Sequence, residues 1–160
     1  MQIKVTYPKT AVCVLKSDTV NGVIHLTEYE KYTVIEGKLS GLKPNKKHGF
    51  HIHEYGDLTD GCASACAHFN PYNKKHGGRN SEERHVGDLG NLEGDMFGNC
   101  QFKFTDSQVR LSGDANVIGR SMIVHEDEDD LGTGGHKDSH TTGHAGKRLV
   151  CGVIGWKKNC

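Results

Sequence analysis

The sequence has no long hydrophobic run and no excess of charge of either sign. Its longest apolar run near the N-terminus covers residues 11–15, which is too short for a signal-peptide core or a membrane span. Twenty Lys and Arg balance twenty Asp and Glu, so no overall basic field would hold nucleic acid or an acidic membrane surface. We therefore expect a mature intracellular N-terminus, a cytoplasmic protein, and neither a nucleic-acid nor a membrane partner.

The cysteines are few and none of them forms a CxxC pair, which argues against a four-cysteine zinc site. Six cysteines in 160 residues are also too few for a disulfide-stapled framework. A chain of this length can bury a core of its own, so we predict one domain over residues 1–160. The cysteines stand at positions 13, 62, 66, 100, 151 and 160.

Sustained helical periodicity is also missing, and short alternating segments take its place. The clearest is residues 99–105, where Cys100, Phe102 and Phe104 alternate with polar residues, as in a strand with one buried face. Turn signals such as Asn21-Gly22 separate the segments, which indicates an all-β antiparallel sandwich or barrel. The predicted strands cover residues 10–16, 22–29, 32–39, 48–53, 99–105, 108–112, 121–125 and 149–156.

Two segments, residues 54–84 and 126–147, do not fit this pattern. Both are rich in Gly, His and Asp and poor in apolar residues, and loops of that length are uncommon in compact domains. Something other than a hydrophobic core must order them. Most of the eleven histidines lie in or beside these segments, so metal coordination would supply the constraint.

His51 and His53 lie two residues apart in a predicted strand. Their side chains would therefore point to the same face, where they can approach one ion, while Ile52 faces the core. Such a pair alone is weak evidence for a metal. His125, at the end of the SMIVH segment, could complete an all-imidazole site with them, and such a site favours copper.

A second candidate site combines three imidazoles and a carboxylate, a set that suits tetrahedral zinc. With no open position, such a site would be structural. The alternative is a polar loop whose histidines are neighbours only in sequence. The four residues are His68, His76, His85 and Asp88.

Several motifs, in order, make the chain resemble the copper/zinc superoxide dismutase family of the cytosolic type. They include GFHIHEYGD, HFNP, KHGG, EERHVGDLGN, VHE-x2-DDLG and CGVIG, and the match extends from Thr10 to Trp156. The resemblance implies an all-β, eight-stranded Greek-key β-barrel (an Ig-like sandwich) with two long metal-ordered loops. It also implies an enzyme that disproportionates superoxide to dioxygen and hydrogen peroxide, with one copper and one zinc per subunit.

The resemblance further implies which residues serve the two metals. His51, His53, His68 and His125 would hold copper, and His68, His76, His85 and Asp88 would hold zinc, so that His68 bridges both metals. By the same resemblance, Asp129 links a copper ligand to a zinc ligand, Arg148 guides the anion, and Cys62 and Cys151 form a disulfide. Arg148 and His68 would act in catalysis.

The resemblance implies superoxide as substrate and a homodimer, and it leaves open a copper chaperone as a further partner. A zinc-stabilised copper carrier or accessory domain is the alternative function, although relatives of that kind typically lack a copper ligand or the arginine. The residues that match the family's dimer patch are Tyr55, Ile118, Gly119, Val153 and Trp156.

Three residues depart from the family's usual pattern. Cys66 stands where a glycine is usual, and its thiol could compete for Cys62 or relay oxidation to Cys151; we favour the simpler reading, a buried free thiol. Lys137 replaces a usual acid, and Thr141 stands where many members carry a lysine. The sequence therefore leaves undetermined how fast charge draws the substrate to the site and how that rate depends on salt.

Overall fold

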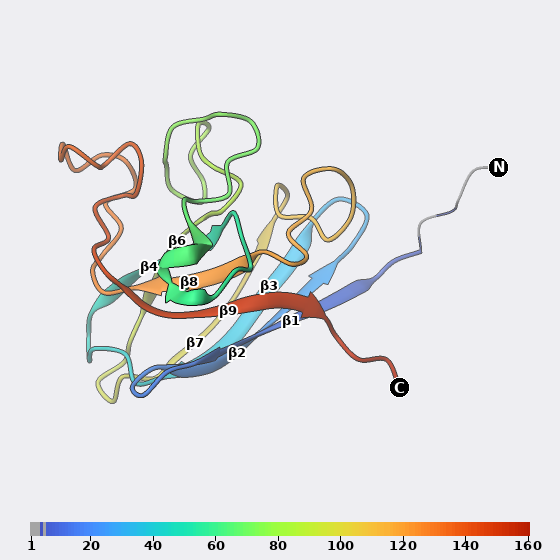
Figure 1. Cartoon of the computed structure of the whole chain (residues 1–160), viewed down its shortest axis with the longest axis horizontal. Coiled ribbons are helices and arrows are strands. Elements are labelled where there is room, and N and C mark those ends of the chain that lie inside the picture. The colour runs from blue at the N-terminus through green and yellow to red at the C-terminus, as the bar shows by residue number, and fades with distance from the viewer. Residues whose placement is uncertain (1–3, 5) are drawn as a thin grey trace.

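Eight antiparallel strands form one sheet that curls into a nearly closed barrel in the computed structural model, which describes residues 4 and 6–160 (Figure 1). The strand order is β6-β4-β8-β9-β1-β2-β3-β7, and the two end strands, β6 and β7, contact each other. A ninth strand, β5, and a short 3-10 helix, η1, lie outside this order. The elements are β1 (Lys9–Lys16), β2 (Asn21–Glu28), β3 (Thr33–Ser40), β4 (Lys47–His53), β5 (Thr59–Cys62), η1 (Ala63–Ala65), β6 (Asp88–Glu93), β7 (Cys100–Asp106), β8 (Ser121–His125) and β9 (Arg148–Trp156).

Alternating side chains of the strands fill the barrel. In β1, Ala11, Cys13 and Leu15 are buried, and their neighbours point outward. Phe50 of β4 packs edge-on against Phe102 of β7, with ring centroids 5.6 Å apart. Burying a side chain of this size contributes about 1.5–3 kcal/mol, so this face of each strand stabilises the barrel.

Strand β4 is buried on both faces. Phe50 and Ile52 are fully buried in the core, as predicted for Ile52, while His51 and His53 are buried on the other face. The two long loops cover that second face, and they extend from the same side of the barrel in Figure 1. One strand therefore joins the hydrophobic core to a layer of imidazoles.

The sequence-based prediction of strands is largely confirmed. Residues 121–125 form β8 as predicted, and six further predicted strands agree within one residue at each end. The strand expected at 108–112 is wrong. The Asp106 carboxylate accepts the backbone N–H groups of Gln108 and Val109 instead, so this segment turns, and only Arg110 makes an isolated bridge.

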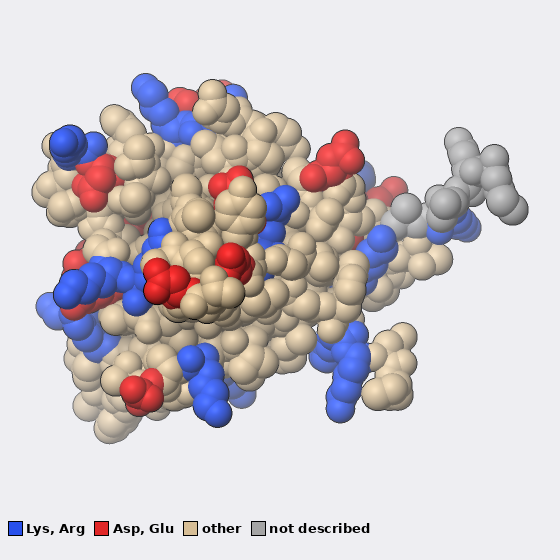
Figure 2. Space-filling model, in the orientation of Figure 1, with Lys and Arg blue, Asp and Glu red and all other residues tan. Residues whose placement is uncertain are grey.

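Strands β5 and β6 were not predicted. β6 begins at a candidate metal ligand, Asp88, and contains Gly90 in a left-handed conformation (φ 77°), which obscures the alternating pattern. Within the described residues, no helix is long and apolar enough to cross a membrane. Acidic and basic side chains are interspersed over the face shown in Figure 2, in keeping with the balanced composition. One domain over residues 1–160 stays a prediction.

Candidate metal centre

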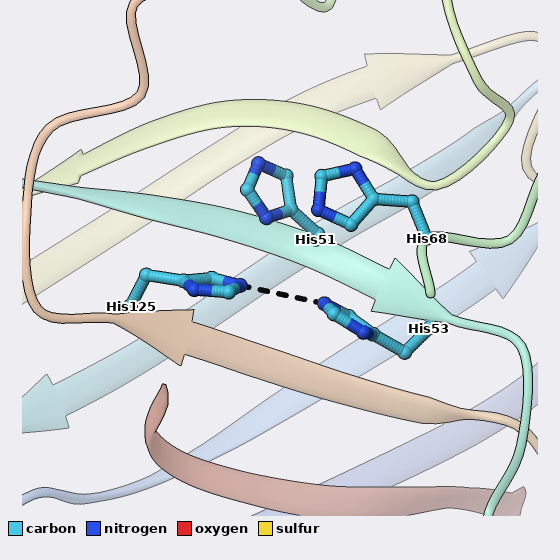
Figure 3. Close-up of side chains that lie close together, drawn as sticks. All are labelled: His51, His53, His68 and His125. Carbon is cyan, nitrogen blue, oxygen red and sulfur yellow. Dashed lines mark hydrogen bonds between the residues drawn. The ribbon is translucent and has the colours of Figure 1, made fainter. Parts of the chain in front are cut away.

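Four buried histidines from three parts of the chain converge beside β4. His51 and His53 come from β4, His125 ends β8, and His68 comes from the loop that follows η1. One ring nitrogen from each lies within 4.8 Å of those of the others, and the rings turn toward one another in Figure 3. The His53 and His125 Nε2 atoms are 3.3 Å apart. The structure thus brings together the four residues that the family resemblance assigned to copper.

A second group lies next to the first and shares His68 with it. The Asp88 Oδ1 atom is 3.0 Å from His68 Nδ1, 2.9 Å from His76 Nδ1 and 3.1 Å from His85 Nδ1. His85 Nδ1 is also only 3.3 Å from His68 Nδ1. Three imidazole nitrogens and one carboxylate oxygen around a common point form the donor set that suits tetrahedral zinc.

Three buried ring nitrogens in these groups have no hydrogen-bond partner among the described residues. They are His51 Nδ1, His68 Nε2 and His76 Nδ1, although the last lies close to the Asp88 carboxylate. A buried polar atom left without a partner costs about 1–3 kcal/mol. His51 belongs to the first four-residue group, His76 to the second and His68 to both, so one metal ion bound in each group would satisfy all three atoms.

Burial keeps the first group in the form that binds metals. It lowers the pKa of His53 to about 2 and that of His125 to about 4, and it also lowers the pKa of His51 and of His68. At pH 7 these imidazoles are neutral and offer a lone pair. Burial acts to raise the pKa of Asp88, but hydrogen bonds from His68 and His85 and the close imidazole of His76 outweigh it and hold the pKa well below its usual range.

Asp129 links the two groups, as the family resemblance implied. Its carboxylate accepts Nε2–H of His51 at 2.6 Å and Nε2–H of His76 at 2.7 Å. Protons on these Nε2 atoms leave the Nδ1 lone pairs for a metal, in agreement with the unpartnered Nδ1 atoms. Burial acts to lower the pKa of His76, but its hydrogen bond to Asp129 and the close carboxylate of Asp88 raise it to about 9.

Asn91 of β6 holds Asp129 in place, a role that sequence reasoning missed. Its side chain donates to the Asp129 carbonyl at 3.0 Å and accepts the Asp129 N–H at 2.8 Å. The signal available in the sequence was only its place at the end of the GDLGN motif, three residues after Asp88. His48 is buried and bonds to the His125 carbonyl through Nδ1 at 2.8 Å, so it supports a ligand rather than acting as one.

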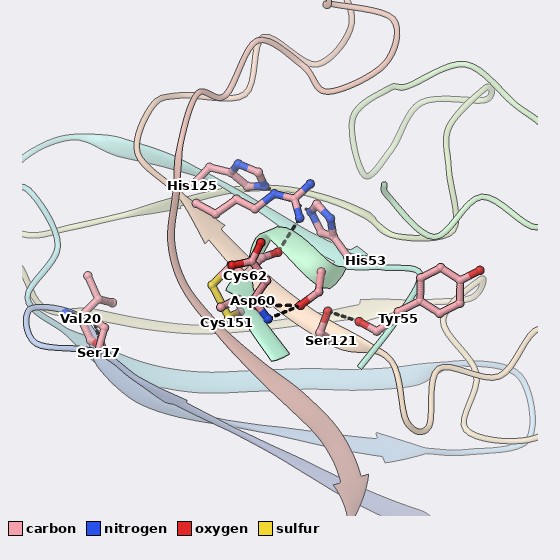
Figure 4. Close-up of a disulfide and its surroundings, with 12 residues drawn as sticks. Ser17, Val20, His53, Tyr55, Asp60, Cys62, Ser121, His125 and Cys151 are labelled. Carbon is pink, nitrogen blue, oxygen red and sulfur yellow. Dashed lines mark hydrogen bonds between the residues drawn. A yellow bond between two sulfur atoms is a disulfide. The ribbon is translucent and has the colours of Figure 1, made fainter. Parts of the chain in front are cut away.

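Arg148 stands at the start of β9, opposite His125 in the β8–β9 ladder. Its guanidinium donates to the Cys62 carbonyl at 2.6 Å and to the Cys66 carbonyl. The Cys62–Cys151 disulfide, with a Cα–Cα distance of 5.7 Å, ties the segment carrying these carbonyls to β9 (Figure 4). Burial lowers the pKa of Arg148, but an arginine stays charged at neutral pH.

The other residues singled out from the sequence lie at the surface. Cys66 is a free thiol, but it is exposed, so the expectation of a buried thiol is wrong. Its left-handed backbone (φ 62°) is the conformation that a glycine adopts without strain. Lys137 and Thr141 are exposed on the 126–147 loop.

Known proteins resemble this chain over nearly its whole length. The family profile described as copper/zinc superoxide dismutase (SODC) matches residues 20–154. The chain belongs to the copper/zinc superoxide dismutase family. A superoxide dismutase [Cu-Zn] of Paramecium bursaria Chlorella virus 1 is 53% identical over 156 residues, which cover 98% of this chain and 83% of that protein.

Two further proteins that are similar to this chain are described in other terms. An extracellular superoxide dismutase [Cu-Zn] of Brugia pahangi is 48% identical, over 94% of this chain and 77% of that protein. A crystal structure described as the clock protein EA4 superposes with a TM-score of 0.92 at 43% identity, over 98% of this chain and all of that one. The fold is therefore that of a copper/zinc superoxide dismutase, whereas the cytosolic subtype is not decided by these relatives.

The chain is thus a superoxide dismutase that uses copper and zinc. It disproportionates superoxide to dioxygen and hydrogen peroxide, and the named relatives support this enzyme rather than the copper-carrier alternative. The His and Asp groups suit the two metals in number, chemistry and burial.

Proposed function

We propose that His51, His53, His68 and His125 hold copper, that His68, His76, His85 and Asp88 hold zinc, and that both metals share the His68 imidazole. One observation carries the assignment. His68 turns Nδ1 toward Asp88 at 3.0 Å, and its opposite nitrogen, Nε2, is buried beside the all-imidazole group without a hydrogen-bond partner among the described residues. An imidazole gives up its second proton near neutral pH only where two cations flank it.

Copper, when bound, supplies the electron chemistry by alternating between Cu(II) and Cu(I). The chain's own residues do the rest. In one half of the cycle His68 would take up a proton from solvent at Nε2, and in the other half it would give that proton to the second superoxide; the second proton of hydrogen peroxide would come from solvent. Asp129 keeps the protons of His51 and His76 on Nε2, which fixes both rings in their binding orientation.

We propose that Arg148 binds superoxide through its planar guanidinium. Bonds to two carbonyls occupy part of its donor set, and a guanidinium has five N–H donors, so others stay free for an anion. The disulfide restrains the carbonyl on Cys62 and thereby the direction of the guanidinium. Arg148 also lies opposite His125 in the ladder, close to the copper group.

The test is His125→Ala, with His140→Ala as the matched control on the exposed loop. The first variant removes one proposed copper ligand and no proposed zinc ligand. We expect it to keep zinc and lose copper and dismutation, measured by metal analysis and superoxide decay on one sample. The control should keep all three. Unchanged dismutation in His125→Ala would overturn the assignment.

We also propose a homodimer. The support is a set of side chains that stay exposed although they are large and apolar: Tyr55 is 50% exposed, Val153 41% and Trp156 56%. Ile118 and Gly119 were assigned to the same patch from the family resemblance. Val153→Glu should lower the sedimenting mass from twice the 17.6 kDa chain toward one chain, whereas Val23→Glu on β2 should not. Equal masses for both variants would refute the patch.

We propose that the protein acts in the cytoplasm. Two free thiols, Cys66 and Cys160, are exposed, and reducing compartments are where exposed thiols persist. Cell fractionation with antibody detection tests this, and recovery of the protein only outside the cells would contradict it.

Delivery of copper by a copper chaperone is a further proposal. It is supported by the burial of all four proposed copper ligands under the loops, which leaves little access for a free ion. Equal rates of copper uptake from a copper-loaded chaperone and from a small Cu(I) complex would contradict it.

A further inference from the structure

Two histidine rings stack face to face on the outer part of the 126–147 loop. The ring centroids of His136 and His144 are 3.7 Å apart, and the planes of the two rings differ by 10°. Both residues are exposed, and neither belongs to the two metal groups described above. This part of the loop projects away from the barrel in Figure 1. Two imidazoles therefore lie within reach of each other and of solvent.

The Asp138 carboxylate orients one of the two rings. Its Oδ1 atom accepts Nδ1–H of His144 at 2.7 Å, and the Thr142 hydroxyl donates to its Oδ2 atom at 3.2 Å. The Asp138 carbonyl accepts the N–H groups of Thr141 and Thr142, at 3.1 and 2.9 Å, which holds Asp138 in place. Because the proton is on Nδ1, the Nε2 atom of His144 keeps its lone pair. A carboxylate prepares metal-binding histidines in the same way.

Buried neighbours fix the backbone at both histidines. The His136 N–H donates to the Ser139 hydroxyl at 2.8 Å, and Ser139, which is only 1% exposed, donates in turn to the Asp130 carboxylate. His144 has a left-handed backbone (φ 55°) and lies between two buried residues. The folded loop therefore places the two rings side by side before any ion binds.

Stacked rings at this separation can share one metal ion. Zinc–imidazole bonds are about 2.0–2.1 Å long, so two nitrogens on one ion are at most about 4 Å apart. Exposed rings can tilt until both lone pairs meet, and water can fill the remaining positions. The carboxylates of Asp130 and Asp138 outweigh the single charge of the exposed Lys137 on this part of the loop. Two imidazoles with an acidic surrounding suit Zn(II) or Cu(II).

We propose that His136 and His144 form an auxiliary site for a divalent zinc or copper ion, with Asp138 as the positioning carboxylate. This loop site would cross-link the outer part of the 126–147 loop. The inference goes beyond the dismutase reaction, and it does not depend on which residues hold the two buried metals.

An ion at the loop site would also restrain the cover of the Asp129 link. Gly143 directly precedes His144, and a side chain at Gly143 would collide with the Asp129 carboxylate and the His76 ring. The Gly143 carbonyl accepts the Asp130 N–H at 2.9 Å. Restraint of His144 therefore reaches the residue that packs directly on the link between the two metal groups.

Binding is tested with Zn(II) as the probe on enzyme already loaded with zinc and Cu(I), which is diamagnetic. The resident metals are counted first in each variant. Calorimetry then counts the additional ions bound per chain, and nuclear magnetic resonance follows the ring C–H signals of His136 and His144. We compare His144→Asn with His140→Asn, which removes another exposed histidine of the same loop. Asparagine tolerates the left-handed backbone at position 144.

The unmodified chain and His140→Asn should each bind one additional zinc ion, and His144→Asn should lose this binding. Asp138→Asn keeps both rings and should weaken the additional binding about 10- to 100-fold. Asp114→Asn, which removes an exposed carboxylate elsewhere, should not weaken it. The loop site would be overturned if no additional ion binds, or if His144→Asn and His140→Asn lose binding equally.

The cross-link is tested by amide hydrogen exchange at Thr141 and Thr142, whose N–H groups bond to the Asp138 carbonyl. If opening of the loop separates the two rings, zinc at about 100 times its Kd should slow this exchange about 100-fold. His144→Asn should show no such slowing at the same zinc concentration. Additional zinc with unchanged exchange would overturn the cross-link while leaving the ion site in place.

Discussion

Asp129→Asn should weaken zinc binding without unfolding the barrel. The Asp129 carboxylate is fully enclosed and accepts Nε2–H of His51 and of His76, at 2.6 and 2.7 Å, and the N–H of Leu131 at 2.8 Å. An amide has one acceptor oxygen and an NH2 group, so it can accept from one histidine and must turn a donor toward the other. The histidine that faces the NH2 group would lose either its fixed tautomer or its ring orientation, and zinc is weakened when that histidine is His76.

Loss of such a partner typically costs 10- to 100-fold in metal affinity, which corresponds to about 1.4–2.7 kcal/mol. The assay is a competition titration of the metal-free protein with zinc and a chelator of known affinity. Glu128→Gln is the matched control, because Glu128 is a near neighbour that is exposed and pairs at 3.6 Å with Lys47, a residue outside both metal groups. A zinc Kd for Asp129→Asn within twofold of the control would refute the reasoning.

Three further predictions follow from the same geometry. Arg148→Ala should lower kcat/KM by about tenfold and flatten its salt dependence while metal content stays constant, since one charge-assisted contact to the anion is lost; an unchanged rate by pulse radiolysis would remove Arg148 from the mechanism. Cys62→Ser removes the disulfide to Cys151, which joins residues 89 apart, and should lower the free energy of unfolding by about 4–5 kcal/mol in the chain-entropy model. Cys160→Ser should change that free energy little, and denaturant titration compares the two variants. The pKa of His76 is raised from 6.5 to about 9 in the folded metal-free chain, so its stabilising contribution is complete below pH 6.5 and is lost as the pH rises through about 9. Zinc binding at about pH 7.5 should therefore release about one proton from His76, and calorimetry in buffers of different ionisation enthalpy that shows no release would contradict this.

The sequence predicted the fold best in strands whose side chains alternate between apolar and polar. β8 and the burial of Ile52 followed from alternation alone, because a strand places successive side chains on opposite faces. β6 could not be predicted in this way. Asp88 is a candidate metal ligand and Gly90 adopts a left-handed backbone, so neither residue contributes to an alternating apolar pattern. The strand predicted at 108–112 does not form, because the Asp106 carboxylate accepts backbone N–H groups that a neighbouring strand would otherwise bond.

The ligands of the candidate site could be predicted from the sequence, but not the contacts that hold those ligands in place. Imidazole-rich motifs identified His68 and its companions, and the family resemblance supplied Asp129, Arg148 and the disulfide. Nothing in the sequence pattern showed that Asn91 would clamp Asp129. Contacts of this kind depend on loops that meet only after folding, as does the exposure of Cys66.

The double burial of β4 sets a rule for changes in chain length. Residues 50 and 52 pack in the core, and residues 51 and 53 belong to the metal groups, so alternate positions of the strand have different roles. Inserting or deleting one residue between Phe50 and His53 would exchange the two faces for every position beyond it, sending an imidazole into hydrocarbon and an aliphatic side chain to the ligand layer. Natural and engineered variation in β4 should therefore consist of replacements, with insertions and deletions confined to the loops that cover it.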